Sequence, residues 1–235
     1  TTLGGHSFRN CDSLTEVILP DSVIDLGESA FYDCSSLQKV VTGNRLKEIG
    51  THDFGRCTAL KEITIGSSVA SIGDHAFINN ANLETVVFVE GSSLKTIGKY
   101  SFLRCSSLST FTIPEGVTSI GEGAFYGCGP LKVRLPDSVS ELGAAAFTAS
   151  SLESIVIGRG LKVIPEQCFR SCSNLKTVEF GPSLIEIQDH SFLNCTSLEE
   201  VDLKNSPVTK IGTGAFYRCT SVQSLWIPRS VTTLG

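Results

Sequence analysis

The chain has 235 residues, of which 41% are hydrophobic and 18% are charged, and its formal net charge is -5. This acidic balance, with no cluster of Lys and Arg, argues against a nucleic-acid-binding surface, which needs cations to displace counterions from phosphates. The longest apolar stretches, such as residues 86–89, are far shorter than the ~18 residues that a membrane-spanning helix requires. We therefore expect no membrane insertion by this segment.

A phenylalanine recurs every 22 to 25 residues over nearly the whole chain. A fixed period of this length is the signature of a solenoid, in which each repeat buries its apolar face on its neighbours. We therefore predict about ten repeats of 22–25 residues in a single array over residues 1–235, which begins and ends inside a repeat and is truncated at both ends. The recurring residues are Phe8, Phe31, Phe54, Phe77, Phe102, Phe125, Phe147, Phe169, Phe192 and Phe216.

The copy between Phe102 and Phe125 shows the predicted elements of one repeat in chain order. Apolar residues alternate with polar ones toward the end of residues 108–113, which is typical of a short strand with one buried face. Pro114 closes this strand and turns the chain, and a second short extended piece follows over residues 117–120. A helical or 3₁₀ turn is then predicted to carry the phenylalanine, with a small residue directly before it. Asp53 is the exception at that small-residue position.

Cysteine stands three residues after most of these phenylalanines, and Asn80 and Ser150 replace it in two repeats. Cysteines in one register lie about one coil apart with parallel Cβ vectors, which do not converge as a disulfide requires. We therefore expect a column of buried free thiols, with no disulfide and no bound metal. The column comprises Cys11, Cys34, Cys57, Cys105, Cys128, Cys172, Cys195 and Cys219, while Cys168 fills a small-residue position.

Three length changes depart from the common repeat. Two residues are added around Glu90 and Gly91, one is added around Asn205, and the strand over residues 131–135 is one residue short. A residue missing inside a strand predicts a local irregularity of the sheet.

The segment CSSLSTFTIPEGVTSIGEGAFYGC, residues 105–128, resembles the BspA-like class of leucine-rich repeat proteins, and the resemblance extends over essentially the whole chain. It implies a right-handed leucine-rich repeat superhelix. The Asn ladder of the commoner leucine-rich repeat is absent, and the Cys and Phe columns fill the interior instead. Members of the class are typically surface or secreted proteins of host-associated bacteria and of protists, in which adhesion is the usual function.

The outward face of the predicted strands is where a solenoid usually binds. Near the C-terminus this face carries an acidic patch of Glu179, Glu200 and Asp202, followed by the lone Trp226. Aromatic and Arg side chains concentrate at binding hot spots. The candidate partner-binding residues are therefore Trp226, Arg134, Glu179, Asp202 and Glu200.

The four histidines, His6, His52, His75 and His190, share the position two residues before the phenylalanine. His52 and His75 fall in adjacent coils, but two imidazoles without a third ligand make a poor zinc site. No catalytic motif breaks the repeat register. We therefore predict a non-enzymatic chain with no cofactor and no metal.

Together these patterns favour a non-enzymatic protein-binding repeat domain. The resemblance implies an ectodomain of an adhesin-like protein, located outside the cell or on its surface, whose partners are proteins of a host or a neighbouring cell. One alternative is an intracellular, cytoplasmic scaffold that holds the subunits of an assembly, which nine free cysteines fit equally well. A second is a spacer that only separates an attached domain from its support. A signal peptide upstream of Thr1 would exclude the scaffold.

Overall fold

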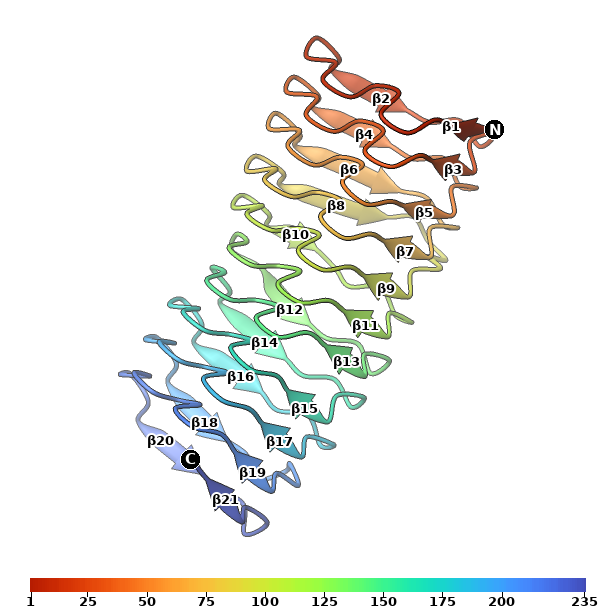
Figure 1. The fold of residues 1–235 in the computed structure, drawn as a ribbon. Coiled ribbons are helices and arrows are strands. Elements are labelled where there is room, and N and C mark those ends of the chain that lie inside the picture. Colours follow the sequence, from red (N-terminus) through yellow and green to blue (C-terminus); the bar gives the residue numbers. More distant parts are fainter.

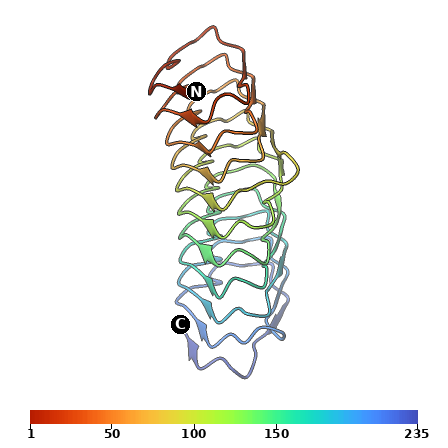
Figure 2. The ribbon, with the colours of Figure 1, turned by 90° about the vertical axis from the view of Figure 1, so that its right-hand side faces the viewer.

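In the computed structural model, which describes residues 1–235, each repeat forms one turn of a parallel β-solenoid (Figure 1). The alternating pattern explains which side chains face inward, since Ile63 and Ile65 of one strand are buried while Glu62 and Thr64, which alternate with them, are half-exposed. The predicted solenoid of short parallel strands with about ten repeats is confirmed. The two termini lie at opposite ends of the stack (Figures 1 and 2).

Even-numbered strands form one long face, which we call the strand face. They are β2 (Glu16–Ile18), β4 (Lys39–Val41), β6 (Glu62–Ile65), β8 (Thr85–Phe88), β10 (Thr110–Phe111), β12 (Lys132–Arg134), β14 (Ser154–Val156), β16 (Thr177–Glu179), β18 (Glu200–Asp202) and β20 (Ser224–Trp226).

Odd-numbered strands form a second face, and each has two residues. They are β1 (Thr2–Leu3), β3 (Asp25–Leu26), β5 (Glu48–Ile49), β7 (Ser71–Ile72), β9 (Thr96–Ile97), β11 (Ser119–Ile120), β13 (Glu141–Leu142), β15 (Val163–Ile164), β17 (Glu186–Ile187), β19 (Lys210–Ile211) and β21 (Thr233–Leu234). The turns that carry the phenylalanines close each coil on the remaining side, which we call the turn edge.

The recurring phenylalanines lie in one continuous column along the core. Neighbouring rings are stacked nearly parallel, as in the pairs of Phe102 with Phe125 at 5.3 Å and Phe125 with Phe147 at 5.2 Å between ring centroids. The seven rings from Phe54 to Phe192 are fully buried, whereas Phe8 in the first coil is 40% exposed. Each interior ring therefore contacts the rings of both adjacent coils.

The predicted helical or 3₁₀ turn at the phenylalanine is wrong, because the turn edge consists of successive turns without a helix. The residues two before and two after the phenylalanine have left-handed backbone conformations, such as His75 at φ 58° and Asn79 at φ 59°. A left-handed residue at every fourth position prevents helical turns from following one another. Backbone N–H groups instead bond the next coil, as Phe77 donates to Ser101 at 2.7 Å.

The cysteine thiols form a hydrogen-bonded ladder beside the phenylalanine column. Each thiol of the column except that of Cys11, in the first coil, donates to the carbonyl of the phenylalanine one coil earlier, as Cys105 Sγ does to Phe77 O at 3.3 Å and Cys128 Sγ to Phe102 O at 3.1 Å. Asn80 fills the same place, and its Nδ2 donates to Phe54 O at 2.8 Å. Burial raises the pKa of the Cys105 thiol to about 12, which keeps the proton available for donation. All nine cysteines are free.

The ladder of the second face is interrupted twice, and a single residue accounts for each interruption. Between β13 and β15 the interruption is at Pro165, which has no N–H where Gly143 donates to Ile120 O at 2.8 Å one coil earlier. Between β3 and β5 it is at Asp53, whose Oδ2 accepts the N–H of Gly50 at 2.6 Å. The inter-strand bond is therefore lost to a side-chain acceptor at Asp53 and to a missing donor at Pro165.

Asp53 is a fully buried carboxyl in the column that small residues otherwise fill. Its Oδ1 accepts the N–H of Ala30 at 3.3 Å in addition to the bond from Gly50. Burial raises the pKa of Asp53 to about 6, and these two hydrogen bonds oppose the rise. The carboxyl therefore titrates well above its usual range.

The strand face is interrupted between β10 and β12 and again between β16 and β18. The first interruption precedes the strand that lacks one residue, and the predicted irregularity is confirmed there. In several other coils the residue equivalent to Ile113 donates to the next strand, as Leu19 does to Val41 O at 2.9 Å and Leu135 to Val156 O at 2.9 Å. Ile113 has no such bond, and β12 does not pair with β10.

The end coils expose apolar side chains that interior coils bury, such as Leu225 at 53% and Leu234 at 66%. The chain forms no helix with the length and apolar character needed to cross a membrane.

Candidate binding surface

The strand face presents two outward rows of side chains, one on each side of the buried central residue of every strand. Three of its large apolar side chains outside the core are Ile18, 65% exposed, Val87, 42% exposed, and Trp226, 53% exposed. The rows otherwise mix Thr, Ser, Lys and Glu, which suit a half-exposed sheet. The face therefore offers separate apolar contact points within a polar surface.

The structure brings some of the predicted partner-binding residues together and separates others. Asp202 on β18 lies directly opposite Trp226 on β20, and Glu200 lies opposite Ser224. Arg134 on β12 is opposite Val156, which is in turn opposite Glu179 on β16. Arg134 and Glu179 are therefore two coils apart, and Glu179 is separated from β18 by the second interruption of the sheet.

Lys204 organises the cluster around Trp226, and the sequence analysis did not include it. Its Nζ lies 3.2 Å from Asp202 Oδ2 and 4.2 Å from the centre of the Trp226 ring. The Lys204 N–H also donates to Asp202 Oδ1 at 3.0 Å, and this bond lowers the pKa of Asp202. A signal was present, since Lys204 directly follows a strand at the point where Asn205 lengthens the repeat.

The acidic patch consequently carries less uncompensated charge than its sequence indicates. Lys204 pairs with Asp202, and Glu200 Oε1 accepts a hydrogen bond from Ser224 Oγ at 3.1 Å. Glu179 takes part in no ion pair and is exposed. Trp226, Lys204 and Asp202 thus form one cation–π and ion-pair cluster on the last two strands of this face.

The middle of the strand face contains two hollows, one on each side of β10. The first, of about 500 Å³, lies between β8, the loop that follows it and β10, and Val87, Val89 and Pro114 contribute to its lining. The second, of about 470 Å³, lies between β10 and β12 and includes Lys132. The length changes beside these hollows are visible in the sequence, but no sequence pattern connects them with a site.

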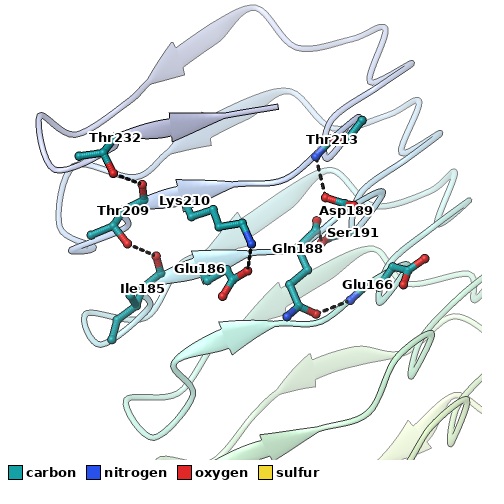
Figure 3. Close-up of polar contacts among 10 residues, drawn as sticks. All are labelled: Glu166, Ile185, Glu186, Gln188, Asp189, Ser191, Thr209, Lys210, Thr213 and Thr232. Carbon is teal, nitrogen blue, oxygen red and sulfur yellow. Dashed lines mark hydrogen bonds and ion pairs between the residues drawn. The ribbon is translucent and has the colours of Figure 1, made fainter.

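The second face carries polar side chains that link successive coils (Figure 3). Lys210 Nζ lies 2.8 Å from Glu186 Oε1, and this pairing raises the pKa of Lys210. Gln188 stands where most repeats have Gly, and its Oε1 accepts the N–H of Glu166 at 3.1 Å. Asp189 Oδ1 accepts the N–H of Thr213 at 2.7 Å.

Threonine hydroxyls continue the same linkage, since Thr232 and Thr209 donate to carbonyls one coil earlier at 3.3 and 3.4 Å (Figure 3). Most polar groups of this part of the second face already have partners within the chain. They connect neighbouring coils to one another.

The turn edge carries the predicted histidine pair. The rings of His52 and His75 are stacked at 4.9 Å, and the Tyr100 ring continues the stack at 5.5 Å from His75. Burial is the main cause that lowers the pKa of His52, with the neighbouring His75 adding to it. No group of three or more His, Cys, Asp or Glu side chains lies close enough together to hold a metal ion.

Comparisons with known proteins agree with this architecture. A profile described as "BspA type Leucine rich repeat region" matches residues 1–93 and 140–235 in six copies. No relative was found among curated proteins.

Among solved structures, a leucine-rich repeat protein of T. pallidum is 26% identical and has a TM-score of 0.53. The match covers 89% of this chain and 78% of that protein's chain. The pneumococcal vaccine antigen PcpA is 19% identical and has a TM-score of 0.59. The match covers 100% of this chain and 69% of the PcpA chain. A leucine-rich cell surface protein of Faecalibacterium prausnitzii is 25% identical and has a TM-score of 0.49. The match covers 96% of this chain and 82% of that protein's chain. The profile matches most residues of this chain, and the chain therefore belongs to the BspA-type leucine-rich repeat family.

Proposed function

We propose that this chain is a non-enzymatic binding domain of an adhesin-like protein, displayed on a cell surface or secreted, and that it recognises protein partners through its strand face. The observation that carries the proposal is the contrast between the two faces. Polar groups in the C-terminal part of the second face are largely engaged in bonds between coils, such as Lys210 with Glu186. The strand face exposes the large apolar side chains of Ile18, Val87 and Trp226, which are not part of the core.

The Trp226 cluster supports recognition of a protein surface. A half-exposed Trp with a cation over its ring and a carboxylate beside that cation offers apolar area and hydrogen-bonding groups in one place. Arg134 adds an exposed guanidinium on the same face. The family supports the proposed extracellular location, since its members are typically surface or secreted proteins.

The nine free thiols favour a second candidate function, an intracellular scaffold, because a reducing compartment preserves thiols. In the adhesin-like protein, burial protects them instead, as for Cys105 and Cys128, which are almost completely buried. The residues encoded upstream of Thr1 discriminate between the two, since a secretion signal excludes the scaffold.

The test is a binding screen of the purified chain against an array of purified cell-surface and extracellular-matrix proteins. A strand-face variant with Arg134, Glu179, Asp202 and Trp226 all replaced by Ala is compared with a control variant in which Glu48, Glu141, Lys162 and Ile185 of the second face are replaced by Ala. Circular dichroism and thermal melting establish that both variants are folded.

We expect the partners of the native chain to lose at least about tenfold in affinity for the strand-face variant, because a few central residues carry most binding energy, and to keep their affinity for the control. Equal loss in both variants would contradict binding through this face. A chain that binds none of the proteins would leave the spacer function as the better account.

A further inference from the structure

Two departures from the common repeat length occur on either side of one strand. The loop after β8 is two residues longer than in the common repeat, at Glu90 and Gly91, and the strand after β10 is one residue short. The longer loop projects beyond the neighbouring coils (Figure 2, yellow). The short strand separates β12 from β10. Both changes therefore shape the surroundings of β10, and neither is needed to complete a coil.

The result is a pair of adjacent hollows that we together call the β10 groove, formed by Val87, Val89, Gly91, Thr110, Thr112 and Pro114 with Lys132 at its far end. Thr110 and Thr112 line both hollows, so the two are neighbours across β10. Their volumes, about 500 and 470 Å³, are in the range of sites that accept small ligands or side chains.

Aromatic rings form the floor of the groove. Phe88 is half-buried and lines the first hollow, and its ring meets the ring of Phe111 edge to face at 5.6 Å. Phe111 replaces the Val or Ile of most other repeats and packs edge to face against Phe102 at 5.1 Å inside the core. The floor is therefore supported from below, and it offers a partly accessible aromatic surface at the bottom of a rim of β-branched residues.

The charges at the rim are unbalanced. At the far end Lys132 is paired with Glu153, with 3.8 Å between Nζ and Oε2. Glu115 lines the first hollow, and neither Glu115 nor the exposed Glu90 of the loop takes part in any of the six ion pairs of the chain. A cationic group of a partner would therefore meet carboxylates that make no direct ion pair, next to the apolar floor.

We propose that the β10 groove binds an extended segment of a partner protein that carries a branched apolar or aromatic side chain next to a basic residue. The distance from β8 to β12 is about two strand spacings, roughly 10 Å, which an extended segment of about three residues spans. The apolar side chain enters the hollow beside Val87 and Pro114, and the basic residue faces Glu115. This inference rests on the proposed function and specifies which part of the strand face is used.

The test uses a display library of random heptapeptides selected on the immobilised full chain, followed by affinity measurements with synthetic copies of the enriched peptides. The first variant deletes Glu90 and Gly91, which returns the repeat to 23 residues and removes one wall of the groove. Its matched control deletes Asn205, which also returns a repeat to 23 residues, far from the groove. The second pair is Val87→Asp with the control Ile185→Asp, an apolar residue of the second face that is equally exposed.

We expect enriched peptides to share an apolar residue next to Lys or Arg. Their affinity should fall at least about tenfold in the loop deletion and in Val87→Asp, and stay unchanged in both controls. Glu115→Gln should weaken binding about threefold or more, and the loss should shrink when the basic residue of the peptide is replaced.

Three results would overturn the inference. Peptides that bind the loop deletion and Val87→Asp as tightly as the native chain place the site elsewhere, and if they depend on Trp226 instead, the proposed function stands while the β10 groove is excluded. A library that yields no binder, although the native chain binds proteins in the array, also excludes the groove. If neither peptides nor proteins bind, the proposed function fails together with the inference.

Discussion

Replacement of the buried Asp53 provides the most quantitative consequence of the structure. The carboxyl is fully buried, and burial raises its pKa to about 6 from an ordinary value of 3.8. The folded chain therefore holds this proton over a pH range in which the unfolded chain has already released it. Stability contributed by the neutral form is present at low pH and is lost as the pH rises through this range.

The difference of about 2.2 pKa units corresponds to about 3 kcal/mol, since one unit is 1.36 kcal/mol. Between pH 4.5 and pH 7.5 the same linkage relation gives a loss of about 2 kcal/mol, with little further change above pH 7. Asp53→Ala removes this dependence and introduces the residue that neighbouring repeats already have, such as Ala30 and Ala76. Gly50 N–H then becomes free to bond β3, as equivalent residues do in other coils.

The measurement is urea denaturation of the native chain and of Asp53→Ala at pH 4.5 and pH 7.5. The difference between the two proteins at each pH removes the contribution of other titrating groups, among them the nearby Glu48 and Asp25. We expect the variant to gain about 2 kcal/mol on the native chain when the pH rises from 4.5 to 7.5. Parallel pH profiles for the two proteins would refute the reasoning.

Three further predictions concern the repeat columns and the sheet. Phe125→Ala removes a buried ring from the middle of its column and should lower the free energy of unfolding by roughly 3 to 5 kcal/mol, and a urea-measured change below ~1 kcal/mol would mean that the ring is not packed. Asn80→Cys keeps a donor to Phe54 O and removes the unpaired buried Oδ1, so it should stabilise the chain by about 1 kcal/mol, and lower stability would contradict the ladder. Pro165→Gly restores an N–H opposite Leu142, and this amide should exchange with deuterium as slowly as that of Gly143, whereas rapid exchange would mean that another cause interrupts the sheet.

Most of the fold could be predicted from the repeat period of the sequence. The spacing of the phenylalanines determines which residues stack, and alternation within each strand determines which of them are buried, as for Ile63 and Ile65. The conformation of the turn edge was harder to predict, because most residues with left-handed backbone there are not glycine. The repeat around Phe125 contained the signal, with Gly123 at φ 56° and Gly127 at φ 66°.

The role of the cysteines was only partly readable from the sequence. A buried thiol is typical of a small apolar residue, but its donor function appears only when the carbonyl of the preceding coil is placed within reach. Asn80 in the same column was the available clue, since an amide and a thiol share little besides an N–H or S–H donor. A hydrogen bond between coils depends on the stacking distance, which residue types alone do not specify.

The candidate site could also be predicted from the sequence only in part. The outward position of Trp226 and Asp202 comes directly from strand alternation, whereas the cation of Lys204 over the Trp226 ring depends on how the longer repeat turns. The β10 groove depends on two length changes in different coils acting on one strand. Each change is visible in the sequence, but their combined effect requires the geometry of the sheet.

The central claim is that partners bind the strand face, and side-chain footprinting tests it most directly. The native chain is treated with hydroxyl radicals alone and in complex with the partner that binds most tightly in the array, and the oxidation of exposed side chains is measured by mass spectrometry. The account predicts protection of Val87 and Trp226 on the strand face and unchanged oxidation of Ile24 and Ile185 on the second face. Protection of Ile24 and Ile185 with unchanged oxidation of Val87 and Trp226 would contradict it.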